Sequence, residues 1–317
     1  MTGFRPFLNS DIPGLVAVWN SQPASPRRLA PLTATLFEQY VLAKPYFDPH
    51  GLIVAEEQGR IVGSVHAGFA TGAPFGALET GAGVICQLLV EPQHSSRAAI
   101  ARGLLTEGEH YLQSRGSQEL YGGGVGWTAP FYLGLYGGCR LPGVMESEVL
   151  WTTTMQDAGY ASSRTQTIWQ RELTDFRAPV DRQNLQLRRQ ARLKPLTDTE
   201  ILRWQEACAW CWTERERYAV VPSAGGPARG VLQFWNMEPL SHSWGTRAMG
   251  LIEVTMSDAD GTASVCCFLG ESLRAFQEQG VTVVEIQTAD NDGILLDACR
   301  RLGFREVDRG VQFRKAC

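Results

Sequence analysis

Two stretches of the sequence, 84–116 and 250–280, share the order apolar strand, short loop and long helix. In the first stretch the helix begins on small residues flanked by two arginines, namely Ser96, Arg97, Ala98, Ala99, Ile100, Ala101 and Arg102. The exposed N–H groups and the dipole at a helix start attract anions, and small side chains let a phosphate approach the backbone. These residues could therefore bind an anionic phosphate group.

The second stretch repeats the first with a different charge. Aligning Val90 with Val254 also aligns Ala99 with Ala263, and it places Asp260 at the loop position where a cation or amide would suit an anion. Asp258 lies close by, and two acids would repel a phosphate. We therefore expect the first stretch to be the anion-binding one, with a plain helix N-terminus as the alternative.

The surrounding elements also occur twice. In both halves we expect a strand with a capped amphipathic helix, then a hairpin, a further strand, and a closing helix with a β-rich tail. In the first half these four are at 4–19, 51–70, 117–124 and 149–173, and in the second at 192–206, 217–237, 281–288 and 295–315. The first half carries an aromatic insertion at 127–148. Residues 175–190 are polar and indicate a linker or a domain-edge strand. We predict domains at 1–174 and 191–317, each an α/β (α+β) fold with a mixed, mostly antiparallel sheet flanked by helices.

The composition is that of a globular protein without a nucleic-acid signature. Among 317 residues, 44% are hydrophobic and 20% charged, with a formal net charge of −4. No basic stripe points to nucleic acid, and no apolar run reaches the roughly 18 residues of a membrane helix. The eight cysteines and five histidines form no metal pattern. We expect a cytoplasmic enzyme, a monomer or homodimer, with no nucleic-acid, membrane or metal partner.

This order of elements resembles the GNAT superfamily of N-acetyltransferases in both halves, over nearly the whole chain. The layout is similar to tandem two-domain members such as mycothiol synthase. The resemblance implies an acyl-CoA-dependent N-acyltransferase that moves an acetyl group from acetyl-CoA to a small-molecule amine. The loop at 96–102 would then hold the pyrophosphate of the coenzyme.

The resemblance also assigns coenzyme contacts on strands. The backbone of Leu88, Leu89 and Val90 would pair with the pantetheine amides as an added strand, while their side chains pack in the core. Asn291, ahead of the last helix, matches a coenzyme-binding asparagine of the family, and a helix cap is an equally good interpretation.

The catalytic groups implied by the resemblance are incomplete. The position of the family's tyrosine acid is Met155 in the first half and Cys299 in the second. Only the thiol could donate a proton, but a cysteine on an apolar helix face more often packs in the core. Tyr132 and Tyr136 of the insertion are replacement acids, or else form a hydrophobic plug or dimer contact. Glu253 is a candidate base or a solvent-facing strand residue. The competing hypotheses are a degenerate pair that binds a ligand or protein without turnover, and assembly through the insertion.

Overall fold

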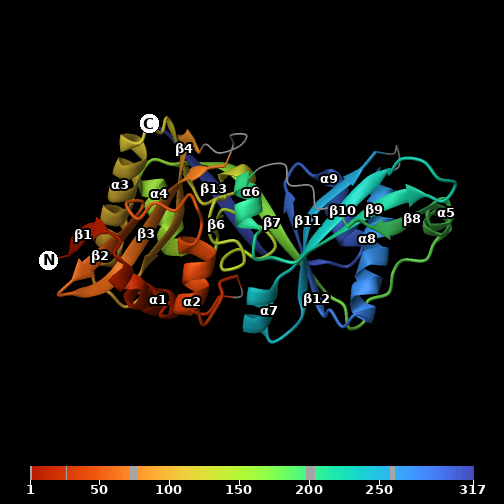
Figure 1. The fold of residues 1–317 in the computed structure, drawn as a ribbon, viewed down its shortest axis with the longest axis horizontal. Coiled ribbons are helices and arrows are strands. Elements are labelled where there is room, and N and C mark those ends of the chain that lie inside the picture. The colour runs from red at the N-terminus through yellow and green to blue at the C-terminus, as the bar shows by residue number, and fades with distance from the viewer. Residues whose placement is uncertain (1, 26, 72–77, 198–203, 258–260) are drawn as a thin grey trace.

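The computed structural model describes residues 2–25, 27–71, 78–197, 204–257 and 261–317, which form two lobes side by side (Figure 1). In the first half the elements are β1 (Gly3–Pro6), α1 (Ile12–Asn20), α2 (Ala34–Phe37), β2 (Leu52–Glu57), β3 (Arg60–Ala70), β4 (Glu79–Val90), α3 (Arg97–Ser114), β5 (Glu119–Gly122), β6 (Val144–Met145), α4 (Val149–Asp157) and β7 (Ala161–Glu172).

The second half repeats this order with its own variations. Its elements are α5 (Arg182–Gln190), β8 (Ala191–Pro195), α6 (Trp204–Ala209), β9 (Arg215–Pro222), β10 (Gly230–Asn236), α7 (Glu238–Trp244), β11 (Ala248–Met256), α8 (Gly261–Glu278), β12 (Val283–Ala289), α9 (Gly293–Arg301) and β13 (Arg305–Ala316). The predicted fold class is confirmed, because the strands build a large mixed sheet flanked by helices.

Local sequence signals explain several element ends. Gln58 and Gly59 both have positive φ, 52° and 77°, which matches the two-residue turn that the β2–β3 hairpin requires. Gly116 and Gly280 follow α3 and α8 with φ of 95° and 82°, the left-handed conformation that ends a helix at low cost. Both hairpins and both glycine helix stops are therefore as predicted.

The sheet is continuous, and the two halves exchange their closing strands. Its order is β1-β2-β3-β4-β5-β13-β7-β12-β11-β10-β9-β8. β13, from the end of the chain, lies between β5 and β7, and β7 of the first half pairs with β12 of the second. Figure 1 shows the C-terminus in the first lobe for this reason. The division at 175–190 stays a prediction, since each half contains a strand of the other.

The polar segment between the halves is partly helical. Residues 182–190 form α5, whose N-cap Asp181 accepts a hydrogen bond from the N–H of Asn184 at 2.7 Å. The expectation of an edge strand there was wrong, because this cap and the packing of α5 on α8 favour a helix. No helix among the described residues has both the length and the apolar character needed to cross a membrane.

Candidate functional site

A β-bulge in each half identifies the equivalent residues of β4 and β11. On β4 one extra residue lies between Gln87, which pairs with His66, and Ile85, which pairs with Ala67. On β11 one extra residue lies between Glu253, which pairs with Gln233, and Leu251, which pairs with Phe234. Gln87 is therefore equivalent to Glu253. The expected match of Val90 with Val254 was wrong by two residues: Met256 is the equivalent of Val90.

Each bulged strand separates from its parallel neighbour. β4 pairs with β5 only as far as Ile85, and β11 pairs with β12 only as far as Gly250. In an antiparallel pair of strands, the backbone N–H and C=O groups of every second residue bond the partner strand, and those of the residues in between point away from it. The N–H groups of Glu91 and Ser257 bond β3 and residue 229 respectively. The main chain of Leu88 and Val90, and of Val254 and Met256, therefore faces the open side.

The open side of β4 is filled by the protein itself. Leu88, Leu89 and Val90 are 1%, 5% and 0% exposed. The Nε2 of Gln22, in the loop after α1, donates to the carbonyl of Val90 at 3.1 Å and to that of Val18 at 3.0 Å. A side chain thus occupies the acceptor that an added strand would use.

The aromatic insertion packs against α1, the helix that precedes Gln22. Tyr132 stacks on Trp19 with ring centroids 6.1 Å apart, and its hydroxyl lies 3.0 Å from Nδ1 of the buried His66. Tyr136 packs edge-on against Trp19 and also contacts Trp151. Burial raises the pKa of both tyrosines well above their ordinary value. Of the three interpretations of these tyrosines, the hydrophobic plug is the one that the structure supports, since both rings are buried within the protein.

The equivalent strand of the second half is accessible. Glu253 and Thr255 are exposed, and Val254 and Met256 are half-buried. The start of α8 lies beside the start of α9, because a Cβ added at Gly261 would be 3.5 Å from Cδ1 of Ile294. Asp258 and Asp260, the two acids expected to repel a phosphate, lie outside the described residues. A strand edge and two helix starts thus border one accessible region.

Solved structures share this architecture. A tandem GNAT protein from the clavulanic acid biosynthesis pathway aligns at 16% identity over 100% of this chain and 98% of its own, with a TM-score of 0.65. A GCN5-related N-acetyltransferase from Sphaerobacter thermophilus aligns at 12% identity over 99% of this chain and 95% of its own, with a TM-score of 0.63. The chain has a tandem GNAT fold.

Other comparisons fix the extent of this likeness. The glucosamine N-acetyltransferase region of a fungal multi-domain GH3 β-N-acetylglucosaminidase matches 99% of the chain and 38% of that protein, at 13% identity and a TM-score of 0.70. No family model matches the sequence, and neither does any curated protein. At these identities the likeness establishes the fold alone.

Within this GNAT fold, the predicted anion loop does open a helix. Ala98 and Ala99 are exposed in the first turn of α3, and their N–H groups bond no described residue, whereas that of Ile100 bonds the carbonyl of Ser96 at 3.0 Å. The other predicted residues surround this turn, with Arg102 exposed, Arg97 half-buried and Ala101 buried. The first half therefore keeps the helix start but has lost access to the strand behind it.

Cys299 is not placed to donate a proton. Its side chain is wholly buried in the second core, on the inner face of α9 with Leu295 and Ala298. Burial and the nearby Asp292 raise the pKa of its thiol to about 12. Of the two interpretations of Cys299, core packing is the one that the structure supports, because the thiol meets core side chains.

Asn291 is exposed at the end of β12. It lines a polar cavity of about 520 Å³ together with residues 162–166 of β7 and with Ala289 and Asp290. The cap of α9 is Asp292, which accepts from the N–H of Leu295 at 3.0 Å, so the cap interpretation of Asn291 was wrong. Its role in binding the coenzyme stays a prediction. Sequence reasoning missed Arg164 of this cavity, because only the strand exchange brings it there.

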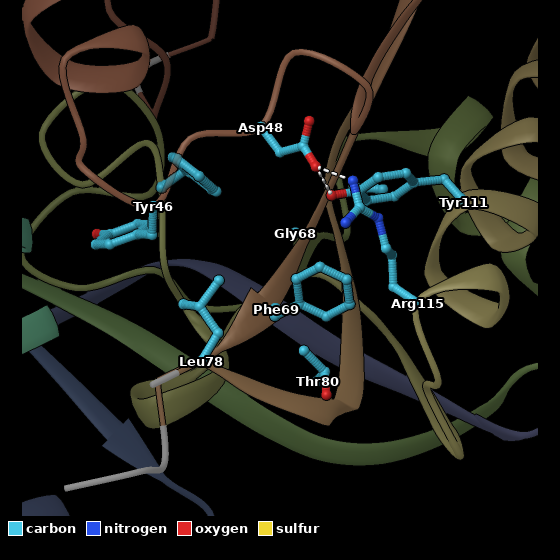
Figure 2. Close-up of a pocket in the computed structure, with 10 residues that line it drawn as sticks. Tyr46, Asp48, Gly68, Phe69, Leu78, Thr80, Tyr111 and Arg115 are labelled. Carbon is cyan, nitrogen blue, oxygen red and sulfur yellow. Dashed lines mark hydrogen bonds and ion pairs between the residues drawn. The ribbon is translucent and has the colours of Figure 1, made fainter. Parts of the chain in front are cut away.

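The one carboxylate among the described residues that line a smaller cavity of about 230 Å³ in the first half is Asp48 (Figure 2). Asp48 at its rim accepts hydrogen bonds from the hydroxyl of Tyr111 at 3.0 Å and from Nη2 of Arg115 at 2.7 Å. Burial would raise the pKa of Asp48, but hydrogen bonds from His50 and Tyr111 and the charge of Arg115 lower it. The carboxylate is thus committed to these neighbours.

Proposed function

We propose that the protein is an acyl-CoA-dependent N-acyltransferase whose coenzyme binds in the second half, with acetyl-CoA as donor and a small-molecule amine as acceptor. One contrast carries the proposal. The open edge of β11 is accessible at Val254 and Met256, whereas on the equivalent edge of β4 Gln22 bonds the carbonyl of Val90 and the residues are buried. The tandem GNAT fold supports the reaction class, and the contrast supports the half.

Three elements would hold the coenzyme. The main chain of Val254 and Met256 faces the open side and offers N–H and C=O groups to the pantetheine amides, as an added strand would. The first turn of α8, with small Thr262 and Ala263, offers N–H groups to the pyrophosphate. Asn291 lies just before α9, whose first turn is beside the start of α8.

Glu253 would act as the base. It is exposed on β11 and faces Gln233 of β10 across the ladder. Its carboxylate would take a proton from the acceptor amine, directly or through one water, as the nitrogen attacks the thioester carbon. The carbon–sulfur bond then breaks, and coenzyme A leaves as a thiolate that takes its proton from water. The first half has Gln87 at this position, and an amide accepts no proton at neutral pH. No covalent enzyme intermediate is required.

A proline substitution tests the binding edge. Val254→Pro removes an N–H that faces the open side while keeping the bonds to β10. We expect it to weaken acetyl-CoA binding in calorimetric titration by about tenfold, the contribution of one lost hydrogen bond. Leu88→Pro is the matched change in the first half, and its acetyl-CoA affinity should equal that of the wild type while its Tm falls. Equal weakening in both variants would refute the choice of half.

Turnover needs a readout that ignores protein thiols. Cys211 and Cys317 are exposed and would react with thiol reagents. Loss of the ultraviolet absorbance of the thioester, followed with a panel of amines, avoids that background. The burial of Cys299 and the methionine at 155 favour a second candidate, a pair that binds without turnover. Acetyl-CoA binding without thioester loss on any amine would support it.

A further inference from the structure

A cavity of about 630 Å³ lies where the two halves meet, close to α2 and α7 (Figure 1). Its first-half wall runs from Leu29 to Tyr40, and its second-half wall consists of Trp212 and part of α7. The hydroxyl of Ser243 on α7 donates to the carbonyl of Ala30 at 2.8 Å and joins the two walls. The volume suits a small organic ligand.

This cavity is separate from the edge proposed to bind acyl-CoA. None of Glu253, Val254, Met256 and Asn291 is among the residues that line it. The second-half wall of the cavity consists of Trp212 and part of α7, which both precede β11 in the chain. The accessible part of β11 begins only beyond Gly250. A ligand here would therefore not occupy the coenzyme region.

The charge of the lining is negative. Glu238, exposed at the start of α7, is its carboxylate, and no lysine or arginine is among the lining residues that the structure describes. Tyr40 lies near this carboxylate: burial, and then the charge of Glu238, raise the pKa of Tyr40 to about 12. Its hydroxyl stays neutral at ordinary pH and bonds none of the described residues. His242 is the other titratable group that faces the cavity.

The rest of the lining is aromatic and apolar. Trp212 is 51% exposed, an unusual position for so large an apolar side chain on a folded surface. Leu29, Leu36, Pro31 and Pro239 complete the apolar surface. An aromatic face beside a carboxylate attracts an organic cation, since the ring quadrupole and the negative charge act together.

We propose that this cavity between the halves binds a small organic cation, an ammonium group carried on an apolar or aromatic body. Glu238 pairs with the ammonium, the Tyr40 hydroxyl accepts a hydrogen bond from it, and the Trp212 ring covers the apolar body. Because the two walls belong to different halves, the bound cation stabilises their contact. The site is independent of acyl transfer and needs no reaction step.

Calorimetric titration with three probes of similar shape tests the charge preference. Phenethylammonium should bind, while 2-phenylethanol and phenylacetate should bind at least tenfold more weakly. Phenethylammonium should also raise Tm in proportion to its occupancy, since it binds only the folded protein. Equal affinity for cation and alcohol, or no binding of the cation at millimolar concentration, would overturn the proposal.

Variants then locate the site. Glu238→Gln and Trp212→Leu should each weaken phenethylammonium binding by about fivefold. Glu38→Gln is the control, an exposed carboxylate near α2 that does not line the cavity, and it should bind like the wild type. Val254→Pro should also bind phenethylammonium normally, so that failure of the acyl-CoA proposal remains distinguishable. An affinity unchanged by both lining variants would place the cation elsewhere and refute the assignment.

Discussion

A buried ion pair joins the two halves, and its removal should destabilise the protein strongly. Arg27, in the loop after α1, and Glu285, on β12, are 1% and 0% exposed at their side chains. Both Nη atoms of Arg27 donate to the two carboxylate oxygens. Glu285 also accepts from the N–H of Cys139 at 2.7 Å and from Nε2 of Gln170 at 2.8 Å. All the acceptor capacity of this carboxylate is thus used inside the protein.

Glu285→Gln keeps the shape but removes the charge that Arg27 faces. Breaking a buried pair from one side costs about 3–5 kcal/mol, because the remaining charge is left without its counter-ion. Gln keeps one acceptor oxygen, so we expect the lower end, about 3 kcal/mol. At about 2–4 °C per kcal/mol for a chain of this class, Tm should fall by roughly 6–12 °C.

The assay is urea unfolding followed by circular dichroism, with calorimetry for Tm. Arg27→Met combined with Glu285→Leu should recover only part of the loss. An apolar pair of similar volume can replace a buried ion pair, but the N–H of Cys139 and Nε2 of Gln170 lose their acceptor. Glu306→Gln, which breaks the exposed pair with Arg309, should leave the midpoint unchanged. A Glu285→Gln variant as stable as the wild type would refute the ion-pair argument.

Other regions give four further expectations. Burial lowers the pKa of His66 to about 3, so the native ring stays neutral while the unfolded ring gains a proton below about pH 6.5. The free energy of unfolding should therefore fall by about 2 kcal/mol between neutral pH and pH 5. Urea midpoints measured against pH should show this fall, and His66→Gln should flatten it. Glu253→Gln should lower kcat at least tenfold with acetyl-CoA affinity unchanged in calorimetry, and an unchanged kcat would exclude it as base. Tyr132→Phe should leave kcat unchanged and lower stability by about 1 kcal/mol, the share of its bond to His66; a kcat loss would restore its predicted role as acid. Residues 1–174 and 191–317 should be insoluble when expressed separately, because each half alone lacks the closing strand of the other. They should fold when expressed together. Two separately soluble halves that unfold cooperatively would contradict the importance of the strand exchange.

Short-range patterns were enough to predict much of the fold. The Gln58–Gly59 turn, the glycines after α3 and α8, and the alternation of strands with helices are local signals, and each has its expected structure. The exchange of β7 and β13 has no such signal. Either tail could pair with either half locally, and the choice depends on contacts far apart in sequence.

The candidate site was predictable only in part. The bulge that makes Glu253 equivalent to Gln87 adds one residue to a strand without a turn residue to mark it, so alignment by helices misplaced the register. The hydrogen bond from Gln22 to the carbonyl of Val90 joins residues 68 positions apart in the sequence. The core packing of Cys299 was predictable, however, since Leu295, Ala298 and Leu302 form one apolar helix face with it.

The location of acetyl-CoA is tested most directly by one matched pair of variants. Ala99 and Ala263 are each the third residue of their helix, α3 and α8. A glutamate there would lie about 5 Å from a bound pyrophosphate and cost roughly 2 kcal/mol at an intermediate dielectric constant. In calorimetric titration, Ala263→Glu should weaken acetyl-CoA binding about thirtyfold and Ala99→Glu less than twofold. Weakening by Ala99→Glu with Ala263→Glu unaffected would contradict the assignment of the coenzyme to the second half.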